Sequence, residues 1–95
     1  MIRILPEATA ELQETVDYYE GEQPGLGVRF VNRFEAAVNQ VHAEPAMYSP
    51  LGQGYRKYGL RPFPYAVIYR IEHDTIVIVA VMHQRRKPDY WRDRA

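Results

Sequence analysis

The sequence predicts a two-layer α+β fold with the element order β-α-α-β-β-β. An N-terminal strand and an antiparallel helical hairpin precede a three-stranded antiparallel sheet and a short C-terminal tail. Three observations support this prediction: apolar residues recur with helical spacing in the first half, the spacing changes to a period of two in the second half, and glycine and proline separate the segments. With 95 residues, the chain is expected to form one domain, 1–95.

The first half of the chain contains the predicted strand and both helices. Residues 2–5 form a short apolar run that ends at a proline. Residues 7–20 place apolar side chains on one helical face and acidic side chains opposite, and residues 26–41 carry a second apolar stripe. A glycine-rich turn at 21–27 links them. Because this link is short, an antiparallel pair is the simplest arrangement.

The second half alternates with the period of a β-strand. Residues 46–54 contain prolines and glycines and are predicted to be a loop. A first strand follows near Tyr55, residues 65–71 alternate between two faces, and residues 76–82 are apolar on both faces, which is typical of a central strand. Residues 73–74 are expected to form the hairpin turn between the last two strands.

This turn predicts which residues face each other and which face the helices. Tyr69 is expected opposite Ile78, and Arg70 opposite Val77. One face of the hairpin should pack under the helices: Tyr65, Val67, Tyr69, Ile71, Ile76, Ile78, Ala80 and Met82. The other face should be an apolar floor with a cationic rim: Ala66, Ile68, Arg70, Val77, Val79, Val81 and His83. Such a floor requires a partner or a covering segment.

Positive and negative charges balance overall but are separated along the chain. Lys and Arg number 12, Asp and Glu number 12, and the formal net charge is zero. Residues 7–22 hold acids and no base: Glu7, Glu11, Glu14, Asp17, Glu20 and Glu22. Residues 55–94 hold most of the bases: Arg56, Lys57, Arg61, Arg70, Arg85, Arg86, Lys87, Arg92 and Arg94. A nonspecific nucleic-acid coat would be basic overall, so we expect a local basic face at most.

Composition also excludes several classes of chemistry. The chain has no cysteine, so disulfides, a thiolate nucleophile and a zinc–thiolate site are excluded. No apolar run approaches the ~20 residues of a membrane span, so a cytoplasmic location without a membrane partner is expected. His42, His73 and His83 fall in different predicted elements, and no cofactor-binding motif is present. We therefore expect neither a metal nor a cofactor.

The cations of the predicted sheet allow two interpretations. Arg56, Lys57 and Arg61 lie on or beside its first strand, where they could be solvated edge residues or contacts to phosphates or to a partner's acids. Arg70 stands among apolar neighbours, and a partly buried guanidinium needs an acceptor. For Arg70 we favour a structural pair, with Glu72 or with an acid on a helix.

The end of the last strand and the tail concentrate further candidates. His83, with Arg85 in phase, could act as a general acid or base beside cations, although a structural histidine at a strand end is the favoured interpretation. Tyr90 and Trp91 could stack on a base. Anchoring of the tail to the body of the protein is the favoured role for this pair.

Four segments, taken in order, match a known pattern. They are ELQETVDYYE, PGLGVRFVNRFEAAVNQV, the Pro45-x-x-Tyr48 step, and RPFPYAVIYRIEHDTIVIVAVMHQRRKPDYW. Together they resemble the RelE/ParE superfamily of toxins from type II toxin–antitoxin (plasmid stabilisation) systems. No single motif is specific, but their order is, and the likeness spans nearly the whole chain.

The resemblance implies one of two activities. RelE-like members cleave mRNA on the ribosome without metal, using basic residues and a C-terminal tyrosine, whereas ParE-like members lack that set and inhibit DNA gyrase. By position, Arg56 with Lys57 or Tyr58 corresponds to the strand lysines of the nucleases, Arg86 to a later arginine and Tyr90 to the tyrosine. The full set of catalytic candidates, if the protein is a nuclease, is Arg56, Arg61, His83, Arg86 and Tyr90.

One departure from the nuclease pattern favours the ParE-like side. Ala66 follows Tyr65 where the nucleases keep an arginine. A cation aimed at a transferring phosphoryl group is typically worth several kcal/mol of barrier, so its loss weakens the case for RNA cleavage. A non-catalytic gyrase inhibitor is therefore the leading hypothesis. The alternatives are a ribosome-dependent mRNA endonuclease, acting on the ribosome and its mRNA, and a degenerate member that binds only its antitoxin.

The resemblance also implies a cognate antitoxin that folds around the toxin. The apolar floor near Val77, Val79 and Val81, or the groove between the helices, is the expected docking surface. A homodimer or a toxin–antitoxin heterotetramer is the expected assembly. The candidate target- or partner-binding residues are Arg56, Lys57, Arg61, Arg70, His83, Arg85, Arg86 and Trp91.

Overall fold

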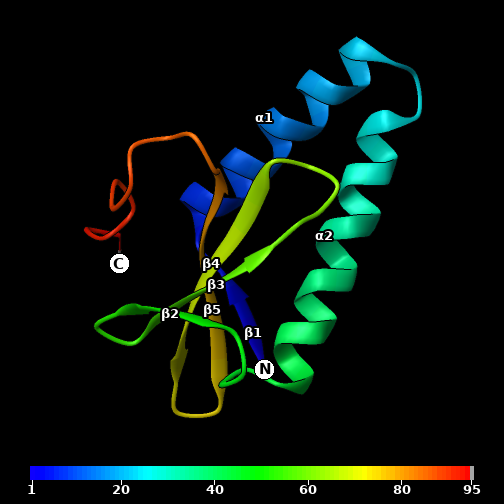
Figure 1. Cartoon of the computed structure of the whole chain (residues 1–95). Helices are drawn as coiled ribbons and strands as arrows, with labels where there is room; N and C mark the ends of the chain where they lie inside the picture. The colour runs from blue at the N-terminus through cyan, green and yellow to red at the C-terminus, as the bar shows by residue number, and fades with distance from the viewer. Residues whose placement is uncertain (95) are drawn as a thin grey trace.

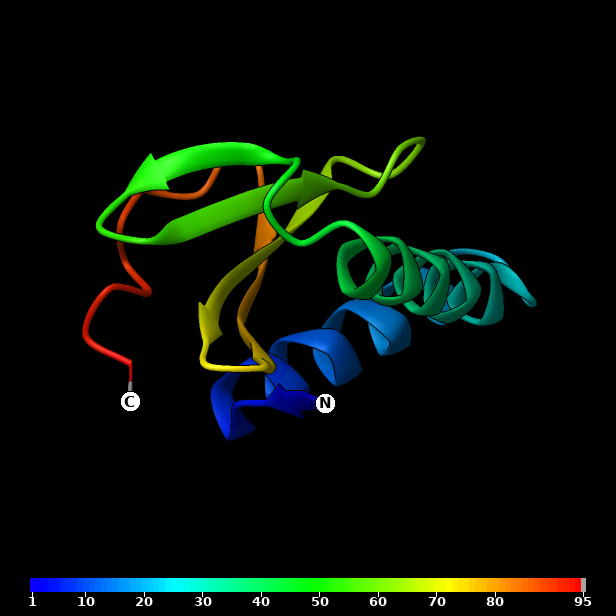
Figure 2. The same cartoon turned by 90° about the horizontal axis from the view of Figure 1, so that it is seen from below.

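A computed structural model describes residues 1–94 of the chain. Its elements, in chain order, are β1 (Ile2–Ile4), α1 (Pro6–Glu22), α2 (Leu26–Ala43), β2 (Ser49–Gly52), β3 (Tyr55–Gly59), β4 (Tyr65–Glu72) and β5 (Thr75–His83). The strands form one sheet in the order β1-β5-β4-β3-β2. The helical hairpin covers one face of this sheet, and the C-terminal segment lies on the side away from α2 (Figures 1 and 2). The predicted α+β class is confirmed.

The sheet has more strands than the sequence predicted. β1 joins it beside β5, and this is the one parallel pair among the described strands. β2 forms inside the stretch 46–54, which was predicted to be a loop, and pairs antiparallel with β3. Pro50 and Gly52 hid this strand, because both residues are poor strand formers except at a sheet edge or bulge, which is where β2 lies.

The helical hairpin closes where α2 begins. A Cβ atom on Gly27 would lie 2.8 Å from the Val16 carbonyl oxygen of α1, so only glycine permits this approach. The N-cap residue of α2 is Gly25, which has no side chain to cap the helix. The Glu20 carboxylate caps it instead, because it accepts hydrogen bonds from the Gly25 and Gly27 N–H groups at 2.9 and 3.0 Å. No helix in residues 1–94 is both long and apolar enough to span a membrane.

The predicted hairpin register is confirmed near the turn. Tyr69 pairs with Ile78, and Arg70 pairs with Val77. The register then shifts: Ile68, next to Tyr69, pairs with Ala80 and not with Val79. One residue of β5 is therefore left over as a β-bulge.

This bulge reverses the faces of the last part of β5. Val81 packs with the helix-side core, whereas Ala80 and Met82 join the cluster on the other face. His83 pairs with Tyr65, and the two rings meet edge to face at 4.9 Å. The predicted faces of Ala80, Val81, Met82 and His83 are wrong, because a single inserted residue shifts an alternation with a period of two.

The face away from the helices is not the exposed apolar floor that the sequence predicted. Trp91, only 2% exposed, packs on it with Leu5 and the sheet residues Ile68, Val77, Val79, Ala80 and Met82. The protein's own C-terminal segment therefore covers this floor. A partner cannot dock on this floor while the segment stays in place, so the expected docking of a partner on the floor is wrong.

Candidate functional site

The C-terminal segment (residues 84–94) follows β5 and packs against the sheet. It leaves β5 through hydrogen bonds from Gln84 N–H to the Pro64 carbonyl and from Arg86 N–H to the His83 carbonyl. Farther along, the Trp91 ring meets the Tyr55 ring of β3 edge to face at 4.8 Å. The predicted anchoring role of Trp91 agrees with this burial.

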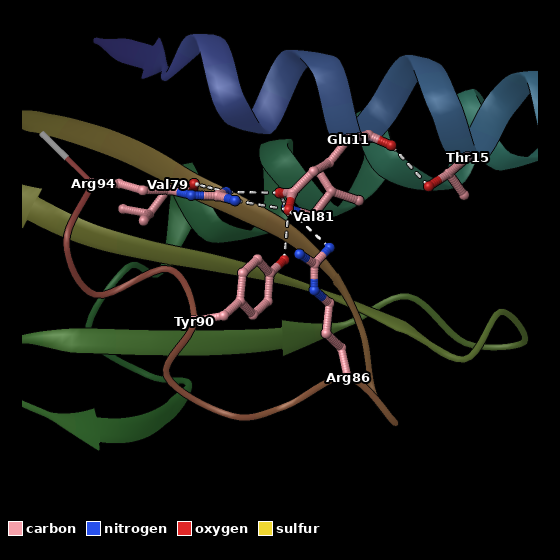
Figure 3. Close-up of polar contacts among 7 residues, drawn as sticks. All are labelled: Glu11, Thr15, Val79, Val81, Arg86, Tyr90 and Arg94. Carbon is pink, nitrogen blue, oxygen red and sulfur yellow. Dashed lines mark hydrogen bonds and ion pairs between the residues drawn. The ribbon is translucent and has the colours of Figure 1, made fainter.

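Glu11 on α1 holds the end of this segment (Figure 3). Its Oε1 accepts hydrogen bonds from Arg94 Nη1 at 2.8 Å and from Val81 N–H at 3.0 Å. Its Oε2 accepts from Arg94 Nη2 at 2.9 Å and from the Tyr90 hydroxyl at 2.6 Å. Arg86 Nη1 lies 3.8 Å from the same oxygen. One carboxylate therefore ties α1, β5 and the C-terminal segment together.

The electrostatics of this cluster follow from burial and hydrogen bonding. Burial by itself raises the pKa of Glu11, but the hydrogen bonds from Arg94, Tyr90 and Val81 outweigh it and lower the pKa below its ordinary value. Burial, together with the hydrogen bond to Glu11, raises the pKa of Tyr90. Tyr90 therefore remains a protonated donor, and its hydroxyl is already engaged within the protein.

Two arginines of the C-terminal segment donate hydrogen bonds to backbone carbonyl groups of β5 and β2. β1 pairs with β5 only as far as Ile78, so β5 lacks a strand neighbour on that side afterwards. Arg94 Nη1 donates to the Val79 carbonyl at 3.0 Å. On β2, Arg92 Nη2 donates to the Leu51 carbonyl at 2.7 Å. Both guanidinium groups thus bind backbone carbonyls of the sheet and fix the C-terminal segment to it.

The remaining sheet cations are divided between structural and open positions. Arg56 donates to the Tyr48 carbonyl at 2.7 Å, and Arg70 pairs with Glu72, as the sequence indicated. Lys57, the neighbour of Arg56 on β3, must point to the opposite face. There it borders a hollow of about 190 Å³ beside the C-terminal segment.

His83 lies at the end of β5 with its ring engaged. Its Nδ1 accepts a hydrogen bond from Arg85 N–H at 3.0 Å, which agrees with a structural histidine at a strand end. The ring also borders a hollow of about 160 Å³ that includes Glu11 and Arg86. The structure thus brings His83 and Arg86 together around Glu11, which accepts the hydrogen bond from Tyr90. Arg56 is bonded to Tyr48 and does not line this hollow.

Besides the half-buried Lys57, four Lys and Arg side chains make no hydrogen bond or ion pair to the described residues 1–94. They are Arg29, Arg61, Arg85 and Lys87, and all four are exposed. The β3–β4 loop connects them, because Pro64 of this loop bonds to Gln84 and the Arg61 carbonyl accepts from Arg33 Nε at 2.7 Å. Residues 23–34, 45–71 and 83–88 contain no acid. We name Arg29, Arg33, Arg61, Arg85 and Lys87 the basic end.

The sequence did not single out Glu11, Arg29 or Arg33. Glu11 was one of six acids on α1. It lies three and four residues from Ala8 and Thr15, but only the structure shows that both of these residues are buried. Arg29 and Arg33 share one helix face, but only the fold shows that this face meets the β3–β4 loop.

This architecture is shared with a solved toxin–antitoxin structure. The structure described as "Chromosomal ParDE TA system from P. aeruginosa" aligns with a TM-score of 0.71 over 86% of this chain and 92% of that chain, at 21% identity. The two chains therefore share the same small α+β fold.

The sequence comparisons establish the family. The family model described as "ParE toxin of type II toxin-antitoxin system, parDE" matches residues 2–88. Two Mycobacterium tuberculosis proteins named Toxin ParE2, from strains CDC 1551 and H37Rv, are each 35% identical over 80 residues, covering 83% of this chain and 76% of theirs. The chain belongs to the ParE toxin family of type II toxin–antitoxin systems, and the predicted RelE/ParE relationship is confirmed.

Proposed function

We propose that this protein arrests growth by binding and inhibiting DNA gyrase without catalysing a reaction, and that a cognate antitoxin neutralises it in the cytoplasm. The observation that carries the proposal is that three of the five nuclease candidates already have partners within the protein. Tyr90 donates to Glu11, Arg86 lies beside the same carboxylate, and Arg56 is bonded to a backbone carbonyl. Ala66, where the nucleases keep an arginine, is completely buried.

The basic end supports a binding role. Arg61, Arg85 and Lys87 are exposed and unpaired within residues 1–94, so they can contact acidic groups of a partner without first breaking internal bonds. Exposed charges on one surface accelerate and orient association with an oppositely charged partner. Arg85 and Lys87 are the residues that we expect to contact the target.

The test measures gyrase supercoiling in the presence of the purified protein. We expect inhibition by the wild type and at least about fivefold weaker inhibition by Arg85→Ala/Lys87→Ala, because two exposed cations are lost. Arg3→Ala is the control, since Arg3 is exposed and distant in the sheet order, with one ion pair to Glu72 at 3.5 Å. Unimpaired supercoiling at saturating protein would contradict the proposal.

A parallel assay addresses the endonuclease alternative. The protein is added to a translating system, and the message is examined for cleavage. We expect intact message. Cleavage that disappears in Arg86→Ala and Tyr90→Phe variants would replace gyrase inhibition with ribosome-dependent RNA cleavage.

The antitoxin is tested by expression in cells. We expect growth arrest when the chain is expressed alone and recovery when a neighbouring antitoxin gene is expressed with it. Unchanged growth in the absence of any antitoxin would favour a degenerate member that retains only antitoxin binding. Light scattering of the purified complex would distinguish a heterotetramer from a heterodimer.

A further inference from the structure

A hollow of about 350 Å³ lies between α2 and the β3–β4 loop. It is lined by Arg29, Asn32, Arg33, Ala36, Pro62 and Phe63. Two arginines thus stand beside a floor made of alanine, proline and phenylalanine side chains. This combination is independent of the Glu11 cluster, and none of the lining residues contributes to that cluster.

The hollow is held in shape before any partner arrives. Arg33 fastens the loop to α2, donating from Nε to the Arg61 carbonyl at 2.7 Å and from Nη2 to the Gly59 carbonyl at 3.4 Å. Phe63 is 9% exposed, and its ring packs at 5.0 Å from the rings of both Phe30 and Tyr19. A rigid site loses less conformational entropy when a ligand binds.

The charge of the hollow specifies the chemistry of its occupant. No acid lines it, and Arg29 and the adjacent Arg61 make no side-chain hydrogen bond or ion pair to residues 1–94. Arg33 Nη1 is also without a hydrogen bond in that part of the chain. Guanidinium groups bind carboxylates in a two-point geometry, so acidic side chains are the complementary partners.

The floor distinguishes a protein partner from a nucleic acid. Base recognition by stacking requires an exposed aromatic face, and Phe63 is almost completely buried. Shallow apolar contact with Ala36 and Pro62 instead suits one aliphatic side chain. We propose that this hollow binds an acidic segment of a partner protein, in which carboxylates flank an apolar anchor residue. The inference does not depend on whether the target is gyrase.

The experiment titrates the full-length, ¹⁵N-labelled protein with a synthetic probe. The probe is an acetylated 12-residue peptide with glutamates on both sides of a single leucine. We expect the backbone amide resonances of Arg29, Arg33 and Phe63 and the Nε resonances of the two arginines to shift. We also expect the binding to weaken with added salt. A peptide with serine in place of leucine and a peptide with glutamine in place of glutamate should each bind more weakly.

Matched variants separate this hollow from the rest of the basic end. Arg29→Glu/Arg61→Glu changes the same charge as Arg85→Glu/Lys87→Glu, and all four side chains are exposed. We expect the first pair to raise the Kd by about tenfold or more and the second by less than about twofold. Ala36→Glu, also exposed and lining the hollow, should weaken binding as well.

Three results would overturn the inference. The first is an equal loss of affinity in both charge-reversal pairs, which would mean attraction by net charge alone. The second is binding that is indifferent to replacement of the leucine. The third is a stronger response of the same resonances to inorganic phosphate or to a single-stranded oligonucleotide than to the acidic peptide. Thermal unfolding of each variant verifies that the fold is retained.

Discussion

Glu11 and Arg94 form a two-point ion pair although they are 83 positions apart in the chain. Arg94 Nη1 lies 2.8 Å from Glu11 Oε1, and Nη2 lies 2.9 Å from Oε2. The two side chains are 12% and 15% exposed. Two parallel hydrogen bonds between ionised groups in a largely buried position hold the C-terminal segment against α1.

Replacement of Glu11 should destabilise the protein. Glu11→Gln keeps a hydrogen-bond acceptor but removes the charge that Arg94 faces, so we expect a loss of about 2 kcal/mol in the free energy of unfolding. Urea denaturation followed by circular dichroism measures this loss. Glu14→Gln is the control, because Glu14 is exposed on the same helix, and its effect should stay within about 0.5 kcal/mol. Equal stability of the two variants would show that the ion pair contributes little.

The same pair should make stability depend on pH in acid. The pKa of Glu11 in the folded protein lies below its ordinary value of 4.5. Its contribution is therefore complete above about pH 4.5 and is lost as the pH falls through the folded-state pKa. Unfolding curves between pH 7 and pH 2 should thus bring the wild type and Glu11→Gln closer in stability as the pH falls. A constant difference across this range would contradict the prediction.

Loss of the Trp91 side chain should open the face that the C-terminal segment covers. Trp91 is 2% exposed, so Trp91→Ala should cost about 3–5 kcal/mol through lost burial and a residual cavity. Thermal unfolding gives the stability, and binding of an apolar dye reports exposure of the sheet. Tyr18→Ala removes an aromatic side chain that is 59% exposed and should change both signals much less.

Two glycines of the helical hairpin should respond in opposite directions to alanine. Gly27→Ala places a Cβ 2.8 Å from the Val16 carbonyl oxygen, so we expect a loss of about 1–3 kcal/mol. Gly21→Ala meets nothing within 4 Å and lies within α1, so it should gain about 0.4–1 kcal/mol. Urea denaturation of both variants tests the close approach of the helices. A neutral Gly27→Ala would mean that α2 can shift away from α1 without cost.

The sequence by itself determined the local elements of this protein. Helical periodicity located α1 and α2, alternation located β4 and β5, and the turn at His73–Asp74 set the pairing of Tyr69 with Ile78. The ordered segments also indicated the family. These features are predictable because they depend on residues that are near one another in the chain.

Only the tertiary structure decided the faces and the site. The bulge beside Ile68 moved Val81 to the helix side, Trp91 covered the floor that alternation predicted to be open, and Glu11 became a buried anchor rather than a solvated acid. Each outcome depends on contacts between residues that are distant in sequence, and on the need of each buried polar group for a partner. Local spacing carries no information about which distant side chain supplies that partner.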